Sequence, residues 1–453
     1  MAQTTAGSLQ GDVLAYLAEE VLPIAQRRLV IHQFGERKRI PRGRGNTWSA
    51  TRYQRLPLPY GPIAEGVPPP SQQLTIQQVI GTAQQWAGLV VITDVAELTI
   101  FHDPFQQAKR MLGYQVGECL ERNDFLVLMG ATQVNYPNLR GSRANLVAGD
   151  VLDPYTIIRT QAALDDIGAP YFDASTEPQI KTDIREGGSR ASTNPRANEH
   201  YVAVGRGLAL ADLRQNPTIV NAWSYSDINR LYNNEVGEWS SIRFCRSNMT
   251  PSFFGAANTA YTVGTPTGTG SGFAAGTYFV IVTGSDTQNQ YESYICAVSA
   301  GTAVTAGQNI PITTPNVAGY TWNVYVGLTT SPQALALATG IPGGPTSGPL
   351  AGQAVQLPSN TTVNLTGIGM PQVPPASPAV GVTVHTVFVF GQGAFAVVEL
   401  ENIEYSYLNA AEKIDPVNQL RTAAWKAFIG AMILNSNFVA RIECASAFSA
   451  TFG

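Results

Sequence analysis

Four histidines, four cysteines and one glycine-rich hexapeptide are the residues of this 453-residue chain whose types suit catalysis or metal binding. The histidines, which are far apart in the sequence and form no H-E-x-x-H pattern, are His32, His102, His200 and His385. Zinc sites use short ligand spacings because a tight loop then brings two ligands together. The sequence therefore predicts neither a metal site nor a cofactor.

The hexapeptide GQGAFA, residues 391–396, matches the glycine fingerprint of dinucleotide-binding proteins. That fingerprint needs a following helix whose N-terminus binds the pyrophosphate. Here the next residues, VVELEN, have a strand pattern, so we interpret the glycines as a tight turn. No phosphate-binding G-x-x-x-x-G-K-[ST] loop and no G-x-S-x-G nucleophile motif occurs. We expect a protein that is not an enzyme.

Acidic pairs have a non-catalytic explanation. Asp165 with Asp166, and Asp94 with Glu97, are predicted on helical or turn surfaces, where solvation or ion pairs between subunits account for them. The four cysteines contain no C-x-x-C pair and are expected to be buried thiols in a reducing compartment, without a structural disulfide. They are Cys119, Cys245, Cys296 and Cys444.

Bulk composition excludes several classes of protein. A net charge of −4 and a pI near 5.7 argue against a dedicated nucleic-acid binder. No apolar run approaches the roughly 20 residues that cross a bilayer, and Met1–Gln10 lacks the pattern of a secretion signal. The length and the 44% hydrophobic content predict two or three globular domains.

Two helices are well marked. Asp103-Pro104 predicts the start of a long helix that ends near Gly130, and Asp153-Pro154 predicts a second that ends at Gly168. In both, aspartate suits the N-cap and proline suits the first helical position. Alternating patterns predict strands at 200–205, 240–245 and 382–390 and in the segments FAVVEL and TAAWKAFIGAMIL.

The N-terminal region combines a proline-broken helical pattern, Asp12–Val30, with a strongly basic extended segment, Arg27–Arg55. This segment has one acid, Glu36, and nine basic residues: Arg27, Arg28, Arg37, Lys38, Arg39, Arg42, Arg44, Arg52 and Arg55. These residues could contact DNA through its phosphates or pair with acidic patches of other subunits. The acidic total charge favours the second interpretation. Leu56–Val91 predicts a long two-stranded excursion.

A charge-poor block interrupts the chain. The 114 residues Thr262–Pro375 contain only two charged side chains, Asp286 and Glu292, whereas the other 339 residues contain 58. The block is rich in threonine, glycine and proline, which is typical of strands and turns. Its strands around 274–286 and 320–332 resemble an immunoglobulin-like or fibronectin-like sandwich, with Trp322 as a core residue. We interpret the block as an insertion.

Taken together, the flanks resemble the major capsid proteins of tailed bacteriophages, which have the Hong Kong 97-type fold, and a podophage-like branch in particular. The resemblance lies in FGERKRIPRGRGNTWSATRYQRLPL, IAEGVPP, VITDVAELTIFHDP, NNEVGEW with RFCRSNM, GQGAFAVVEL and DPVNQLRTAAWKAFIGAMILNSNFVARIE. These stretches occur in the order of the family and cover nearly all of the flanks.

The resemblance implies an α+β fold with a division of labour among its parts. The expected parts are an N-terminal arm (1–50), an extended loop (51–90), a peripheral domain (91–195) with a spine helix (103–130), an axial domain with a return to the peripheral domain (196–260 and 376–453), and the immunoglobulin-like surface insertion (261–375). The loop would overlap a neighbouring subunit, which suits a two-stranded ribbon that is unstable alone.

The resemblance also implies a function. The chain would assemble with itself into hexamers and pentamers of an icosahedral head in the host cytoplasm. The head would enclose double-stranded DNA, bound non-specifically, with scaffold, portal and decoration proteins as further partners and no membrane. The insertion would be displayed outside, suited to weak adhesion. The alternatives are an encapsulin-type compartment that encloses protein cargo and a free-standing adhesin that uses the sandwich domain.

Overall fold

The computed structural model describes the backbone of residues 30–53, 56–58, 61–62, 71–100, 103–172, 200–215, 220–221, 232, 234–268, 272–288, 290–339, 356–408 and 419–449. The chain forms two compact units. Unit 1 contains Met1–Gln133, Ile167–Glu199 and Phe390–Val439, and unit 2 contains Val134–Asp166, His200–Val389 and Ala440–Gly453.

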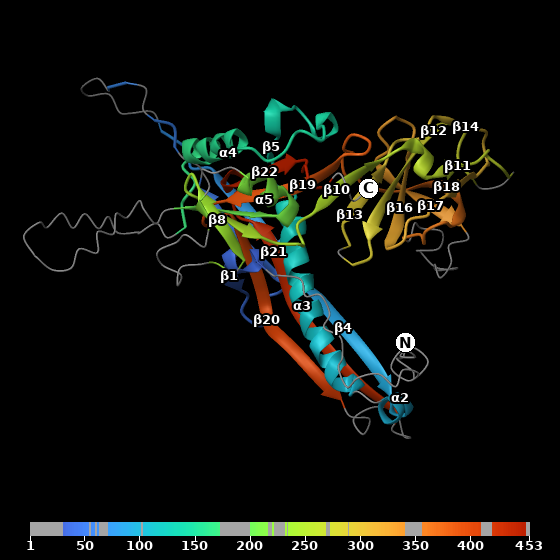
Figure 1. Ribbon diagram of the computed structural model, residues 1–453, viewed down its shortest axis with the longest axis horizontal. Helices are drawn as coiled ribbons and strands as arrows, with labels where there is room; N and C mark the ends of the chain where they lie inside the picture. Colours follow the sequence, from blue (N-terminus) through green and yellow to red (C-terminus); the bar gives the residue numbers. More distant parts are fainter. Residues whose placement is uncertain are drawn as a thin grey trace, which may run out of the picture. The chain divides into compact units, whose positions relative to one another are not determined.

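Unit 1 is built from a long helix and a four-stranded sheet. The strand order is β1 (Glu36–Arg39), β20 (Phe395–Leu408), β21 (Leu420–Ile433) and β4 (Gln84–Thr93). Only β1 runs parallel to its neighbour. Helix α3 (Pro104–Leu128) packs along β21 and β4, with the short helices η2 (Ile31–Phe34) and α2 (Asp94–Thr99) against it (Figure 1).

Helix α3 confirms the predicted start of the long helix. The Asp103 carboxylate accepts hydrogen bonds from the backbone N–H groups of Phe105 at 3.0 Å and Gln106 at 3.1 Å, and Pro104 occupies the first turn. Its buried face contains Ala108, Leu112 and Val116, which recur at steps of four residues as the apolar positions of a helix do. The same face also buries two acids, Glu121 and Asp124, which the apolar pattern did not predict.

A separate antiparallel ribbon extends unit 1. It consists of β2 (Thr47–Tyr53) and β3 (Ile76–Thr82), with the pairs running from Thr47 opposite Thr82 to Tyr53 opposite Ile76. Trp48, Ala50 and Val79 turn one face of the ribbon toward a small core that includes Ile40 and Met432. A two-stranded ribbon is thus present, but the predicted bounds Leu56–Val91 are wrong: β2 lies wholly within the basic segment, and only β3 lies in the predicted range. The next strand, β4, joins the four-stranded sheet instead.

Unit 2 is dominated by one sheet of 16 strands within the described residues. Along the main path the order is β11 (Thr262–Val263), β15 (Ile310–Thr313), β18 (Thr362–Pro371), β17 (Ala334–Thr339), β16 (Tyr320–Gly327), β12 (Gly276–Asp286), β13 (Glu292–Cys296), β10 (Ser252–Ala256), β19 (Thr383–Phe390), β6 (Tyr201–Gly205), β9 (Ile242–Arg246), β8 (Glu235–Trp239) and β7 (Val220–Asn221). Beside this path, β14 (Thr302–Val304) pairs with β12, and β22 (Val439–Cys444) pairs with β19 and β5 (Gln133–Asn135).

The helices that the structure describes in unit 2 lie outside the charge-poor block. They are α4 (Pro154–Ile167), α5 (Gly207–Arg214) and the short turns η3 (Pro137–Leu139), η4 (Arg143–Asn145) and η8 (Asn258–Ala260); η10 (Ser436–Phe438) belongs to unit 1. The second predicted helix is confirmed as α4, and Gly168 follows it with a φ of +74°, as a C-terminal glycine does.

The charge-poor block is all strand as described, yet it is not structurally separate. Its strand β13 pairs in parallel with β10, which precedes the block, so the sheet continues across the boundary. Its hydrophobic core also includes Ala256, and Phe254 packs against it. Trp322 is fully buried in that core, as predicted. The block stands out in the sequence because its side chains are unusual, but side-chain composition does not show how its backbone pairs with other strands. The immunoglobulin-like type remains a prediction.

The predicted domain boundaries stay a proposal, because the two compact units divide the chain in another way. Strands β20 and β21 lie in the unit of helix α3, and α4 lies in the unit of β6 and β9. The reason is that β21 pairs with β4 over ten residues and contacts α3. Such long-range pairing leaves no mark in the local sequence.

Candidate functional site

The basic segment does not form one continuous patch. Arg37, Lys38 and Arg39 lie on β1, Arg42 and Arg44 follow it, and Arg52 lies on β2. The other three predicted residues are outside the described part of the chain, namely Arg27, Arg28 and Arg55. The described basic residues therefore lie on two strands and in the turn between them, which the sequence did not distinguish.

Some of these charges are satisfied within the chain. Lys38 pairs with Glu36, and Arg42 pairs with Glu401 of β20. Arg52 Nη2 donates to Gln77 Oε1 across the ribbon at 2.5 Å. By contrast, three exposed arginines have no ion-pair partner in the described part of the chain: Arg37, Arg39 and Arg44. We call them the free arginines. They are the basic residues left for another molecule.

The outer face of the ribbon is exposed and carries three large apolar side chains among polar ones. Tyr53 and Ile76 lie directly opposite each other and are 63% and 56% exposed, while Ile80, further along the same face, is 57% exposed. Successive side chains of a strand alternate between faces, so this face also carries Thr51, Gln78 and further polar side chains toward Thr47 and Thr82. A ribbon that is packed on one side and exposes three large apolar side chains on the other has the form of an interaction surface.

The N-terminal end of the described chain is fixed by buried acids on α3. Both carboxylate oxygens of Glu121 accept hydrogen bonds from backbone N–H groups. The N–H of Val30 donates to Oε1 at 2.8 Å, and the N–H of Ile31 donates to Oε1 and Oε2, each at 3.0 Å. His32 Nδ1 lies 2.8 Å from Asp124 Oδ2. Glu121 is fully buried, and burial raises its pKa to about 7 against the opposing effect of these N–H donors.

The pKa of His32 moves in the same direction. Burial lowers it, but the hydrogen bond and the negative charge of Asp124 outweigh burial and raise it overall. The sequence did not predict this cluster, because two acids at 121 and 124 resemble a solvated helix face. Their spacing of three residues on the buried stripe was the available signal.

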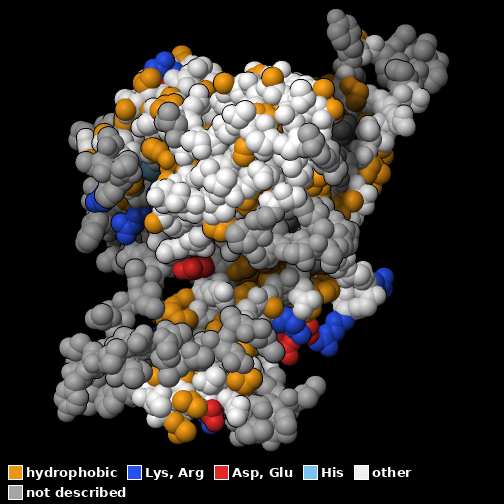
Figure 2. All heavy atoms as spheres, turned by 90° about the vertical axis from the view of Figure 1, so that its right-hand side faces the viewer, with side chains coloured by type: hydrophobic (Ala, Val, Ile, Leu, Met, Phe, Trp, Pro, Cys, Tyr) orange, Lys and Arg blue, Asp and Glu red, His pale blue; other side chains and the backbone are white. Residues whose placement is uncertain are grey.

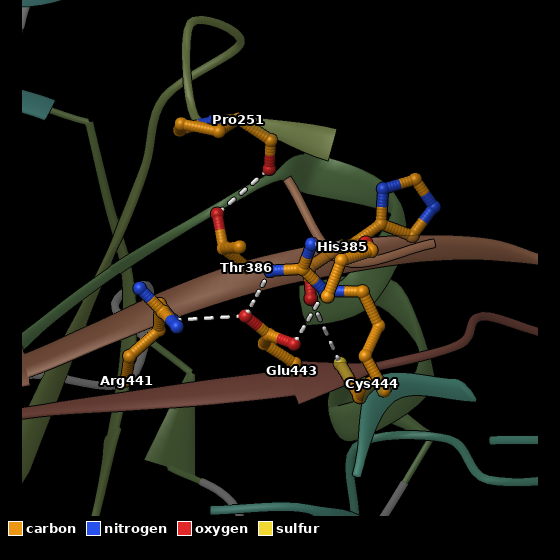
Figure 3. Close-up of polar contacts among 8 residues, drawn as sticks. Pro251, His385, Thr386, Arg441, Glu443 and Cys444 are labelled. Carbon is orange, nitrogen blue, oxygen red and sulfur yellow. Dashed lines mark hydrogen bonds and ion pairs between the residues drawn. The ribbon is translucent and has the colours of Figure 1, made fainter. Parts of the chain in front are cut away.

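Unit 2 contains a buried charge network around Glu443 of β22. Arg143 donates to the Glu443 carboxylate through Nε at 2.8 Å and Nη2 at 2.6 Å, and Arg441 Nε lies 2.9 Å from Oε1. Figure 3 shows Arg441 and Glu443 beside Thr386, whose hydroxyl donates to the carbonyl of Pro251 at 2.7 Å. One carboxylate thus faces two arginines, which is consistent with its complete burial.

Arg143 also reaches the chain that returns from the charge-poor block. Its Nη1 donates to the Ala376 carbonyl at 2.7 Å, and its guanidinium lies 3.7 Å from the ring centroid of Phe253. We call residues 371–381 the strap. At its ends, Gln372 N donates to Gln333 O at 2.9 Å and Gly381 N donates to Gly255 O at 3.0 Å. The strap is therefore bonded to the insert, to Arg143 and to β10.

The motifs considered for catalysis have structural roles. Residues 391–394 form a turn with Gly393 at a φ of +69°, and β20 follows as a strand, which confirms the tight turn. Of the histidines, His32 binds Asp124, His200 Nε2 lies 2.8 Å from the Tyr232 hydroxyl, and His385 is buried. His102 lies outside the described residues. Within the described chain no cluster of metal-ligating side chains is found.

All four cysteines are free thiols. Three are buried, and burial raises the pKa of Cys245, Cys296 and Cys444. A raised pKa keeps the thiol protonated and unreactive, so these residues pack as small apolar side chains.

The surface of the insert is nearly free of charge, and Figure 2 shows mostly uncharged side chains over it. One of its two acids is used internally. The Glu292 carboxylate accepts hydrogen bonds from Thr283 at 2.7 Å, from Asn323 at 3.1 Å and from Tyr325 at 2.9 and 3.0 Å. The insert thus offers almost no charge with which to attract DNA or an oppositely charged partner.

No protein-family model and no curated protein matches the chain. Among solved structures, it is similar to the capsid of Ralstonia phage GP4, with 10% identity, coverage of 95% of each chain and a TM-score of 0.52. Two cyanophage capsids also match. The match to P-SCSP1u has 12% identity, covers 96% of this chain and 93% of that chain, and has a TM-score of 0.48. The match to Pam1 has 11% identity, covers 96% of this chain and 98% of that chain, and has a TM-score of 0.47.

The match to the GP4 capsid extends over nearly the whole of both chains. The chain therefore has a phage capsid fold, and the predicted mixed α+β capsid fold is confirmed. Among the described residues, no helix is both long and apolar enough to span a membrane.

Proposed function

We propose that this protein is the major coat protein of a tailed double-stranded DNA phage, a structural protein that assembles into hexamers and pentamers of an icosahedral head. The observation that carries the proposal is the group of three large apolar side chains, Tyr53, Ile76 and Ile80, exposed on one face of the β2–β3 ribbon in a chain with a capsid fold. In the virion this face would lie on a neighbouring copy, as the extended loop predicted from sequence would.

The energetics support a partner for the ribbon. Burying one large apolar side chain stabilises a complex by about 1.5–3 kcal/mol. Tyr53, Ile76 and Ile80 are all more than half exposed and lie on one face. A two-stranded ribbon alone is marginal in water, and further packing stabilises it. A shell of identical copies supplies that packing at every ribbon.

The free arginines would stabilise the same assembly. We propose that Arg37, Arg39 and Arg44 pair with acidic side chains of adjacent copies, in preference to packaged DNA, because the net charge of the chain is −4. Their replacement by glutamine would then weaken assembly itself. Contact with DNA predicts instead that empty shells form normally and that only DNA retention becomes more sensitive to salt.

We further propose that the insert is displayed on the outer surface and makes weak contacts with uncharged host polymers. Its nearly charge-free surface supports this proposal, since it neither repels a neutral polymer nor binds phosphate. Scaffold, portal and decoration proteins are proposed as further partners.

The test is assembly of the purified full chain, alone and with a co-expressed scaffold, observed by negative-stain microscopy. Closed shells or hexameric and pentameric capsomers are expected. Replacing Ile76 and Ile80 together by serine should abolish shells while the melting temperature of the subunit stays within a few degrees. Gln78→Ser on the same face is the matched control and should assemble. Wild-type chains that stay monomeric in every condition would refute the proposal, and shells that protect protein cargo but no DNA would indicate a compartment.

A further inference from the structure

Helix α4 presents a face that nothing in the described chain covers. Tyr155, Arg159, Ala162 and Asp166 are exposed and recur at steps of four, three and four residues, so they form one stripe along the helix. Ile158 lies beside this stripe; Tyr155 and Ile158 are 59% and 49% exposed. The opposite face buries Thr156, Ile157, Thr160 and Leu164. Figure 1 shows α4 as an outer helix of its unit.

The two charges of this stripe have opposite sign and no partner in the described chain. Arg159 and Asp166 are separated by seven residues, or about 10.5 Å along the helix, which is too far for an ion pair within it. Asp166 also lies in the last turn, where the helix dipole disfavours a negative charge. The neighbouring Asp165 has a partner, since the Tyr201 hydroxyl donates to it at 2.9 Å. No contact within the described chain therefore offsets the unfavourable position of the Asp166 charge.

A second copy of the same helix would satisfy both charges at once. Arg159 and Asp166 are equidistant from the midpoint between Ala162 and Ala163. When two such helices run antiparallel about a two-fold axis at this midpoint, Arg159 of each copy faces Asp166 of the other. The small side chain of Ala162 then lies at the crossing, where it allows close approach. A contact of this kind is isologous, because the same patch serves both partners.

We propose that the α4 stripe is a self-complementary contact between two copies of this chain, with two symmetric Arg159–Asp166 ion pairs and the exposed Tyr155 and Ile158 packed beside them. The choice of a second copy rests on charge complementarity of the stripe with itself, and on the proposed coat function for the presence of many copies. A single helix pair is small compared with stable interfaces. The contact is therefore weak alone and effective through repetition in a shell.

Charge reversal tests this contact, because each single variant should lose self-association and a mixture of the two should regain it. In Arg159→Asp, the stripe of each copy has two acids, and in Asp166→Arg it has two arginines, so each variant repels itself. In a mixture of the two variants, an all-acidic stripe faces an all-basic one and both pairs become attractive. The double variant also restores both pairs, with the signs exchanged. Sedimentation velocity of the full chain below its assembly concentration should show at least a tenfold weaker self-association for each single variant and near-wild-type association for the mixture.

Arg214→Asp, at an exposed arginine at the end of α5, is the matched control and should associate as the wild type does. Circular dichroism melts of every variant verify folding. As a second measurement, Ala162→Cys should form a disulfide between copies under mild oxidation, since the two-fold axis brings the residue next to itself. Ala303→Cys, on an exposed position of β14, should not.

The outcomes separate this inference from the proposed function. Shells that form normally with either single variant, without a cross-link at position 162, would overturn the α4 contact and leave the coat function intact. Single variants that lose association without recovery on mixing would also overturn it, since they indicate a head-to-tail contact with a different surface. Rescue on mixing together with the cross-link would support it even if no closed shell is obtained.

Discussion

Replacing Arg143 by methionine removes a guanidinium that joins three segments of unit 2 while keeping a similar side-chain length. The variant loses the two hydrogen bonds to Glu443, at 2.8 and 2.6 Å, and the hydrogen bond to the Ala376 carbonyl at 2.7 Å. It also loses the stacking on Phe253. Because Arg143 is 7% exposed and Glu443 is fully buried, water cannot replace these contacts without opening the structure.

The size of the stability loss depends on the contacts that Glu443 keeps in the variant. Removing one partner of a buried ion pair costs about 3–5 kcal/mol, because the other charge is left in a poorly solvated site. Arg441 stays 2.9 Å from the Glu443 carboxylate and offsets part of that penalty, so the lower end of the range applies. For a unit of this size, about 3 kcal/mol lowers the melting temperature by roughly 6–12 °C.

The assay combines thermal unfolding with hydrogen exchange of the full chain. Exchange should rise in the strap, residues 371–381, because its central carbonyl loses its donor. Arg214→Met, at an exposed arginine, is the control and should change the melting temperature by less than about 1 °C, as surface substitutions do. A melting temperature for Arg143→Met equal to that of this control, or unchanged exchange in the strap, would show that the network does not hold the insert in place.

Three further predictions concern pH and the insert. His385, whose pKa is lowered to about 4 by burial and by the positive charge of Arg206, must gain a proton in a buried site. The stability of unit 2 should therefore fall by about 3 kcal/mol as the pH drops from 6.5 through 4, and thermal melts of His385→Gln should lack this acid limb. Glu121 makes stability depend on pH in the opposite direction. Because its pKa of about 7 exceeds its ordinary value, the stability of unit 1 should be lost as the pH rises from about 5 through 7. Glu121→Gln should flatten this pH dependence in hydrogen-exchange measurements. Deleting residues 262–375 should lower the melting temperature and increase binding of an apolar dye, because β10 loses its β13 neighbour and Ala256 loses its core; a deletion variant that melts like the full chain would restore the view of the insert as a separate passenger.

Local patterns predicted much of the fold. The Asp-Pro starts of α3 and α4, the strands β6, β9, β19 and β21 and the turn at 391–394 all depend on residues within one turn or one strand. Propensity and capping act at that range, so single segments suffice to identify them. The burial of Trp322 was predictable for the same reason, since it lies among alternating apolar residues.

The candidate sites were predicted only in part. The basic segment was found from composition, but composition could not tell that Lys38 and Arg42 pair with Glu36 and Glu401 while the free arginines remain available. Glu121 and Asp124 were missed because an acid in a helix is usually solvated. Only the approach of residues 30–32, some 90 positions away, gives these acids their donors.

By itself, the sequence determined the types of element, the charge-free character of the block 262–375 and the likeness of the flanks to capsid proteins. These depend on side-chain chemistry and order along the chain. Tertiary structure alone decided that the block shares its sheet with β10, that Arg143 joins the strap to Glu443, and that the ribbon turns Ile76 and Ile80 outward. Those facts depend on backbone pairing and on contacts between residues far apart in the chain, which a local pattern does not encode.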